Sequence, residues 1–60
     1  MTRLLYRVPE AAELLGLSRS KTYELLARGC LHGVLVDGTL RVPASALVEF
    51  VDRLPSSTRR

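Results

Sequence analysis

The 60-residue sequence predicts one small α+β domain in which three helices accompany a single β-hairpin. Three observations support this fold class. Apolar residues recur at helical spacing in two segments, one near each end of the chain. An Asp37-Gly38 pair lies inside an alternating apolar segment, which is the typical sequence of a hairpin turn. Only about three residues separate the first helix from a second one, and that interval predicts a helix-turn-helix.

The first predicted helix follows a short apolar run, residues 3–7 (RLLYR), which we expect to form a strand or an extended arm. Pro9 fits the first helical position, because the N–H that proline lacks would have no intrahelical partner there. Gly16 fits the left-handed residue that ends the helix. Between them runs one apolar stripe, made by Val8, Ala11, Ala12 and Leu15. The alanines in this stripe predict that another helix crosses close by.

A second helix is predicted over residues 19–28, with Ser18 as its N-cap and Gly29 after its end. Helical geometry of about 100° per residue gives it an inward and an outward face. The inward face holds Thr22, Leu25, Leu26 and the end at Gly29; the outward face holds Ser20, Glu24 and Ala27, flanked by Lys21 and Tyr23. The cations Arg19 and Lys21 therefore lie at the N-terminal end, although the helix dipole favours cations in the last turn.

Residues 31–42 alternate as a hairpin does, and two registers are open to them. We expect a three-residue loop, Asp37-Gly38-Thr39, because it lets four apolar residues share the buried face and buries more apolar surface. In this register Val36 lies opposite Leu40. The four residues are Val34, Val36, Leu40 and Val42. A two-residue loop at Asp37-Gly38 would instead pair Leu35 with Leu40 and turn the valines outward.

The last helix is expected to open at Pro43 and to end before Pro55. Its apolar stripe consists of Leu47, Phe50, Val51 and Leu54. We therefore expect one domain over residues 1–55, followed by a polar, flexible tail over residues 56–60. The full order of elements is helix, tight turn, helix, hairpin, helix, which is the architecture of a winged helix-turn-helix.

Composition narrows the class of function. Nine Lys and Arg against six Asp and Glu give a net charge of +3, which makes a polyanion the natural partner. So short a chain leaves little room for an enclosed catalytic pocket, so we expect no enzyme. The single cysteine, Cys30, and the nearby His32 predict neither a disulfide nor a metal site, and we expect no cofactor. Without an apolar run of membrane-spanning length or a signal peptide, we expect a cytoplasmic protein that meets no membrane.

The sequence from Tyr6 to Val51 resembles the excisionase (recombination directionality factor) family, whose members are small MerR-like winged helix-turn-helix proteins. The segments that carry the resemblance are Val8-Pro9-Glu10-Ala11-Ala12, Leu15-Gly16-Leu17-Ser18-Arg19-Ser20, Tyr23, Leu26, Gly29, Leu31, Arg41-Val42-Pro43, Leu47 and Phe50.

This resemblance implies sequence-preferring binding to double-stranded DNA at the attachment site of a phage or integrative element. It also implies that several copies bind side by side, bend the DNA and direct a site-specific integrase towards excision. Two alternatives are a small transcription regulator of the MerR-like class, and a protein-interaction module that dimerises through the helix over residues 47–54. The second alternative predicts a concentration-dependent dimer and no salt-sensitive DNA binding.

The N-terminal half of the second helix carries most candidate DNA-binding residues, because a recognition helix meets base edges there. Arg19 suits a guanine edge, which a guanidinium reads bidentately, whereas the Lys21 ammonium suits a phosphate. Ser20 either bonds to DNA or is merely a polar residue of the first turn. Glu24 either accepts from a cytosine amine or pairs with Arg28.

Three further candidates flank this helix or lie on the wing. The Tyr23 hydroxyl suits a phosphate, and its ring suits packing on the hairpin; both can hold at once. The wing tip is acidic and poor in arginine, so Arg41 is the strongest wing candidate, beside Thr39. Arg41 either binds a phosphate or pairs with Glu10 or Glu49. The sequence does not decide whether Arg53, Arg59 and Arg60 follow the DNA backbone.

Overall fold

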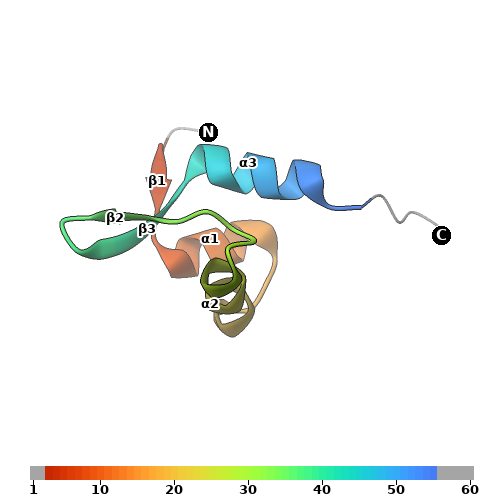
Figure 1. The fold of residues 1–60 in the computed structure, drawn as a ribbon, viewed down its shortest axis with the longest axis horizontal. Helices are drawn as coiled ribbons and strands as arrows, with labels where there is room; N and C mark the ends of the chain where they lie inside the picture. The colour runs from red at the N-terminus through yellow and green to blue at the C-terminus, as the bar shows by residue number, and fades with distance from the viewer. Residues whose placement is uncertain (1–2, 56–60) are drawn as a thin grey trace.

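The computed structural model describes residues 3–55 (Figure 1). The elements follow in the order β1 (Leu5–Tyr6), α1 (Val8–Leu15), α2 (Arg19–Arg28), β2 (Val34–Val36), β3 (Thr39–Pro43) and α3 (Ala44–Arg53). This confirms the predicted α+β winged helix-turn-helix. The predicted tail over residues 56–60, with Arg59 and Arg60, lies outside the described residues.

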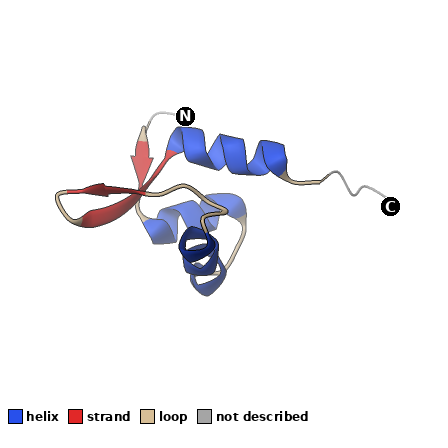
Figure 2. Cartoon of the chain, viewed as in Figure 1, coloured by secondary structure: helices blue, strands red, loops and turns tan. Residues whose placement is uncertain are grey.

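The three strands form one small antiparallel sheet in the order β1-β3-β2. The hairpin of β2 and β3 projects from one end of the molecule, and α3 runs towards the opposite end (Figures 1 and 2). The apolar run before Pro9 does form a strand, because Tyr6 pairs with Val42 and Leu5 with Pro43. β1 thereby ties the start of the chain to the base of the hairpin.

Local signals set the ends of α1 and α2. α1 begins at Val8, one residue before Pro9, and ends at Leu15; Gly16 follows as the C-cap, with a left-handed φ of 74°. The Ser18 hydroxyl caps α2 by accepting a hydrogen bond from the Lys21 backbone N–H at 3.1 Å. Gly29 closes α2 with a φ of 78°. The turn between the helices is therefore short, as predicted for a helix-turn-helix.

The core lies between the sheet and the helices. Ala11 is fully buried, and its small side chain lets α2 approach α1, as the alanine pattern predicted. Thr22 is the buried polar residue of α2, and its hydroxyl donates to the Ser18 carbonyl at 2.9 Å. The buried cluster comprises Tyr6, Val8, Ala11, Leu31, Val42, Ala46 and Leu47, with half-buried residues including Leu15 packed against it.

The predicted hairpin register is wrong. Leu35 pairs with Leu40 and Val36 with Thr39, so the loop is the two-residue Asp37-Gly38. Both loop residues have positive φ, 52° and 77°, as a type I′ turn requires. That turn matches the right-handed twist of the strands. Because the hairpin projects from the body of the domain, burial does not override this preference. The cost is a Leu35 side chain that is 71% exposed.

The apolar stripe of α3 is only partly buried. Leu47 is buried and Phe50 is half-buried, whereas Val51 and Leu54 are about half exposed, at 52% and 51%. The exposed part of the stripe adjoins the end of α1, where Leu14 is also exposed, and these residues line an open apolar groove. The first half of the stripe therefore packs into the core, and its second half lies on the surface.

Candidate nucleic-acid interface

The outward face of α2 is where the sequence predicts it. Thr22 is buried, and Leu25 and Leu26 are half-buried, so the opposite side of the helix faces solvent. That side carries Ser20, Glu24 and Ala27, all of them exposed. A small, polar, exposed helix surface of this kind can enter the major groove, which is wide enough for an α-helix.

Arg19, in the first turn of α2, carries an uncommitted charge at the side of this surface, where it lines a shallow groove with Glu10 and Glu13 of α1. Its side chain is exposed, and it has no carboxylate within 4.0 Å among residues 3–55. Ser20, next to it, is also exposed and has no side-chain hydrogen bond within the same part of the chain. By contrast, the Ser18 hydroxyl is occupied by the helix cap. The first turn of α2 therefore presents a free guanidinium and a free hydroxyl.

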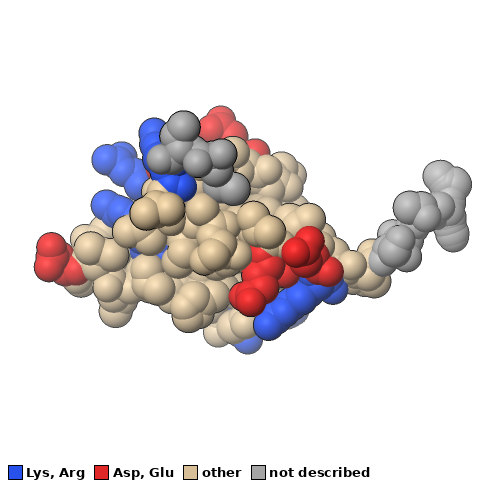
Figure 3. All heavy atoms as spheres, turned by 90° about the horizontal axis from the view of Figure 1, so that it is seen from above, with Lys and Arg blue, Asp and Glu red and all other residues tan. Residues whose placement is uncertain are grey.

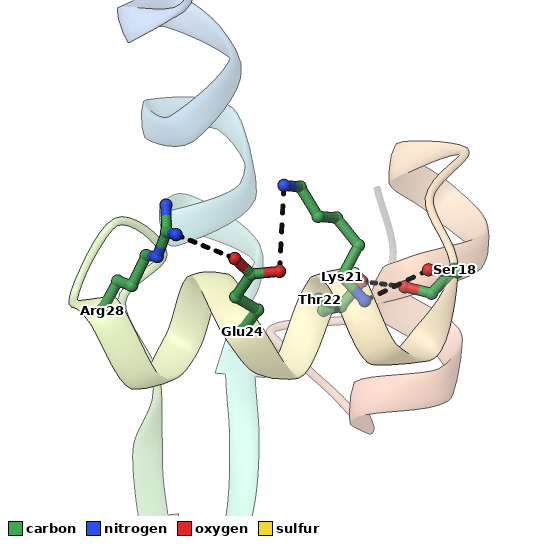
Figure 4. Close-up of polar contacts among 5 residues, drawn as sticks. All are labelled: Ser18, Lys21, Thr22, Glu24 and Arg28. Atoms are coloured by element: carbon green, nitrogen blue, oxygen red, sulfur yellow. Dashed lines mark hydrogen bonds and ion pairs between the residues drawn. The ribbon is translucent and has the colours of Figure 1, made fainter.

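Lys21, Glu24 and Arg28 form a row of charges along one flank of α2 (Figure 4). A Glu24 carboxylate oxygen lies 3.0 Å from the Arg28 guanidinium, and the other lies 3.8 Å from the Lys21 ammonium. The interpretation of Glu24 as the partner of Arg28 is confirmed. In Figure 4 the three side chains point towards the side of α2 on which α3 lies, while the strands leave from the other side. This row has a net charge of +1 and keeps its cations on the flank away from the wing.

Tyr23 lies on the opposite flank, which faces the wing. It is 51% exposed and lines a shallow groove between α2 and the hairpin, together with Leu26, Gly33 and Leu40. The chain passes close at Gly33, where an added Cβ would lie 2.9 Å from the Leu26 side chain. The half-exposed ring beside the hairpin agrees with the predicted packing role.

Arg41 lies on β3, on the sheet face opposite Leu40 and Val42. It is half-buried, and its guanidinium donates to the Leu40 carbonyl oxygen at 3.1 Å. The predicted alternative, a pair with Glu10 or Glu49, is wrong, because no carboxylate lies within 4.0 Å of Arg41 among the described residues. Thr39 is exposed at the start of the same strand, beside the turn.

Glu10 is occupied elsewhere, and this explains why Arg41 lacks it. The Glu10 carboxylate accepts from the Arg3 guanidinium at 2.5 Å and from the Arg7 backbone N–H at 2.9 Å. The hydrogen bond from Arg3, followed by that from the Arg7 backbone, lowers the pKa of Glu10 below its usual value. The same contact raises the pKa of Arg3. Glu10 thus binds the first strand to the first turn of α1.

Within residues 3–55, no three His, Cys, Asp or Glu side chains lie together as metal ligands would. Cys30 is exposed and free. None of the described helices has both the length and the apolar character of a membrane span.

Comparison with known proteins supplies the family. The helix-turn-helix domain family matches residues 5–55. A protein of Saccharopolyspora erythraea named "Probable excisionase" is 42% identical over 52 residues, which are 87% of this chain and 53% of that protein. The "Excisionase" of Streptomyces ambofaciens is 37% identical over 51 residues, 85% of this chain and 82% of that protein. The chain thus spans about half the length of the first relative, and no solved structure matches it. By these matches and its fold, the chain belongs to the excisionase family of small helix-turn-helix DNA-binding proteins.

Proposed function

We propose that the chain binds double-stranded DNA with α2 in the major groove and the wing on the adjacent backbone. The observation that carries this proposal is the exposed polar face of α2 together with the guanidinium of Arg19 in its first turn, which has no ion pair within residues 3–55. In helix-turn-helix proteins the N-terminal residues of the second helix contact the base edges, so a free donor is needed there. Arg19 would read a guanine through its O6 and N7 atoms.

The remaining candidate residues take supporting roles around α2. Lys21 would bind a phosphate on one side of the groove, and the Tyr23 hydroxyl a phosphate on the wing side, because the two residues lie on opposite flanks of α2. Ser20 and Glu24 face the groove floor, where they would bond to base edges. On the wing, Thr39 and Arg41 would contact the backbone. All seven candidates are thus grouped on α2 and the wing: Arg19, Ser20, Lys21, Tyr23, Glu24, Thr39 and Arg41.

We propose that the chain acts as an excisionase. Copies of the chain would bind attachment-site DNA side by side, bend it and direct a site-specific integrase towards excision. Support comes from the two relatives, both of which carry the name excisionase. The test is to mix attachment-site DNA with a purified integrase that is encoded beside the gene, and to measure excision with and without this chain. Excision that requires this chain would support the proposed function. DNA binding without any effect on excision would favour the transcription regulator instead.

DNA binding itself is tested first, by fluorescence anisotropy on a random duplex and on DNA from beside the gene. We expect preference for the second duplex, and an affinity that falls as salt rises with a log–log slope of about 0.9 per phosphate contact. Absence of binding to either duplex at low salt would contradict the proposal.

The protein-interaction module remains a second candidate function because of the half-exposed stripe of α3. The side chains of Val48, Val51 and Leu54 are each about half exposed, and they lie beside the exposed Leu14. A contiguous apolar surface of this kind often marks an interaction site. Sedimentation of the free protein over a concentration series tests this candidate. A dimer that forms without DNA would support it, and a monomer at all concentrations would contradict it.

A further inference from the structure

The sheet brings together two arginines that are far apart in the sequence. β1 and β3 are antiparallel with Tyr6 opposite Val42, so the next position along places Arg7 beside Arg41. Tyr6 and Val42 are both buried. Because side chains alternate along extended backbone, and Arg7 is extended with φ −74° and ψ 157°, the two arginines point to the other face of the sheet.

Neither arginine is neutralised by an acidic neighbour. Within residues 3–55, no carboxylate lies within 4.0 Å of the Arg7 or the Arg41 guanidinium. Glu10 is close to Arg7, but its carboxylate accepts a hydrogen bond from the Arg7 backbone N–H and forms its ion pair with the Arg3 guanidinium. Within the described residues Arg3 thereby has an ion pair and Arg7 and Arg41 have none, although Glu10 also attracts the charge of Arg7 from beyond 4.0 Å. Figure 3 shows Lys and Arg side chains gathered over the end of the molecule that carries β1 and the hairpin.

Two unmatched cations at neighbouring positions of a sheet repel each other and destabilise the free protein. Arg7 is also the N-cap of α1, where it makes no side-chain cap and its charge opposes the helix dipole. An anion between the two guanidinium groups would remove both penalties. Arginine suits this role because its planar donor groups bind phosphate bidentately.

We propose that Arg7 and Arg41 together clamp one phosphate of the DNA backbone at the base of the wing. This inference rests on the proposed DNA binding and adds Arg7, a residue outside α2 and outside the hairpin, to the interface. A backbone phosphate fits better than a free small anion because Arg7 is exposed on an open sheet face, and a polymer holds its phosphates there through its other contacts.

The test compares charge-removing variants for binding to a random duplex over a salt series. Arg7→Gln and Arg41→Gln should each weaken binding several-fold at low salt and reduce the log–log slope by up to about 0.9, the contribution of one phosphate. If the two residues share one phosphate, the double variant should lose little more slope than either single variant. Arg53→Gln is the matched control, because Arg53 ends α3 at the opposite end of the molecule from the wing (Figure 1).

Further measurements separate a lost contact from a lost fold. Arg7→Gln should melt at the same temperature as the wild type or higher at low salt, because it removes one of two repelling charges. Arg7→Lys should keep most of the slope and still lose affinity, because an ammonium cannot bind bidentately.

Two outcomes would contradict the proposed phosphate clamp of Arg7 and Arg41. A third outcome would contradict the proposed DNA binding on which the clamp rests. An Arg7→Gln variant with wild-type affinity and slope would exclude Arg7 from the interface. Slope losses that add fully in the double variant would show two separate phosphates. If the wild-type protein itself shows no salt-dependent binding, the proposed function fails as a whole.

Discussion

The Glu24 carboxylate pairs with the Arg28 guanidinium at 3.0 Å on the exposed surface of α2. The same carboxylate also lies 3.8 Å from the Lys21 ammonium. Both partners remain about half exposed, so each pair is worth at most about 1 kcal/mol and is weakened by salt. Such pairs hold the two cations on the helix surface without preventing them from binding a stronger anion. In the proposed complex, Glu24 would therefore compete with DNA phosphate for Lys21 and Arg28.

Removal of this carboxylate should strengthen binding to random-sequence DNA, in which Glu24 has no dedicated cytosine amine to contact. Glu24→Gln releases two cations and removes one negative charge from the face that is proposed to meet the DNA. We expect higher affinity for a random duplex and a salt slope that is steeper by about 0.9 for each cation that gains a phosphate. Glu49→Gln on α3 is the control for the change in net charge, because Glu49 is exposed and has no ion pair within residues 3–55. If the two substitutions change the affinity and the salt slope equally, Glu24 affects DNA binding only through the net charge of the protein.

Arg19→Ala should act on specificity more than on affinity for random DNA. A bidentate contact to guanine contributes about 1–3 kcal/mol of discrimination, so the ratio of cognate to random affinity should fall about 5- to 150-fold. Because Arg19 is exposed and unpaired in the described structure, the variant should keep the wild-type melting temperature. Competition binding with the two duplexes measures the ratio. An unchanged ratio would remove Arg19 from base recognition.

Leu31 and Leu15 should differ in their contribution to stability. Leu31 is 1% exposed and among the largest fully buried side chains, so Leu31→Ala should cost about 2–5 kcal/mol. Leu15 lies on the predicted stripe of α1 but is only half-buried beside an open groove, so Leu15→Ala should cost less, about 1–2 kcal/mol. Thermal unfolding followed by circular dichroism compares the two variants. A larger loss in Leu15→Ala would mean that the groove is closed in solution.

The ends of α1 and α2 could be predicted because their causes are local. Gly16 and Gly29 adopt left-handed backbone, and the Ser18 hydroxyl bonds to the third residue of its own helix. Each signal therefore lies within a few residues of the feature that it sets. The outward face of α2 follows in the same way, because helical geometry alone places Thr22 inward and Glu24 outward.

Features set by contacts between distant segments could not be predicted in this way. The preferred hairpin register assumed that Val36 would be buried, but the hairpin extends beyond the helices that could cover it, and the turn residues decide instead. Likewise, nothing close in sequence to Arg7 indicates that β1 places it beside Arg41. The pairing of Arg28 with Glu24 was one of two open interpretations, because helical spacing permits that contact without requiring it.

The two-residue turn predicts how the wing responds to substitution. Gly38 has a φ of 77°, so Gly38→Ala should strain the turn and destabilise the wing by about 1 kcal/mol. Asp37→Asn should be neutral or slightly stabilising, because asparagine tolerates left-handed backbone at least as well. Nuclear Overhauser contacts between Leu35 and Leu40 report the register directly. Contacts between Val36 and Leu40 in their place would restore the three-residue loop.

Glu10 should give the domain a measurable sensitivity to acid. Its pKa is lowered in the folded state by the hydrogen bond from Arg3 and then by that from the Arg7 backbone. A carboxyl whose pKa is lower when folded stabilises the folded state above its unfolded pKa, and this contribution is lost as the pH falls through the folded pKa. The loss should therefore begin near the ordinary glutamate range and be complete below it.

Glu10→Gln tests this contribution because glutamine does not titrate. The variant should melt at a lower temperature than the wild type at neutral pH, and the difference should shrink as both are acidified below the carboxyl range. Glu49→Gln, exposed and unpaired in the described part of the chain, is the control. Since Glu10 also pairs with Arg3, its removal leaves Arg3 as a third cation without an ion pair near Arg7 and Arg41 among the described residues. Parallel melting curves of Glu10→Gln and wild type across the acid range would show that this carboxylate contributes nothing to folding.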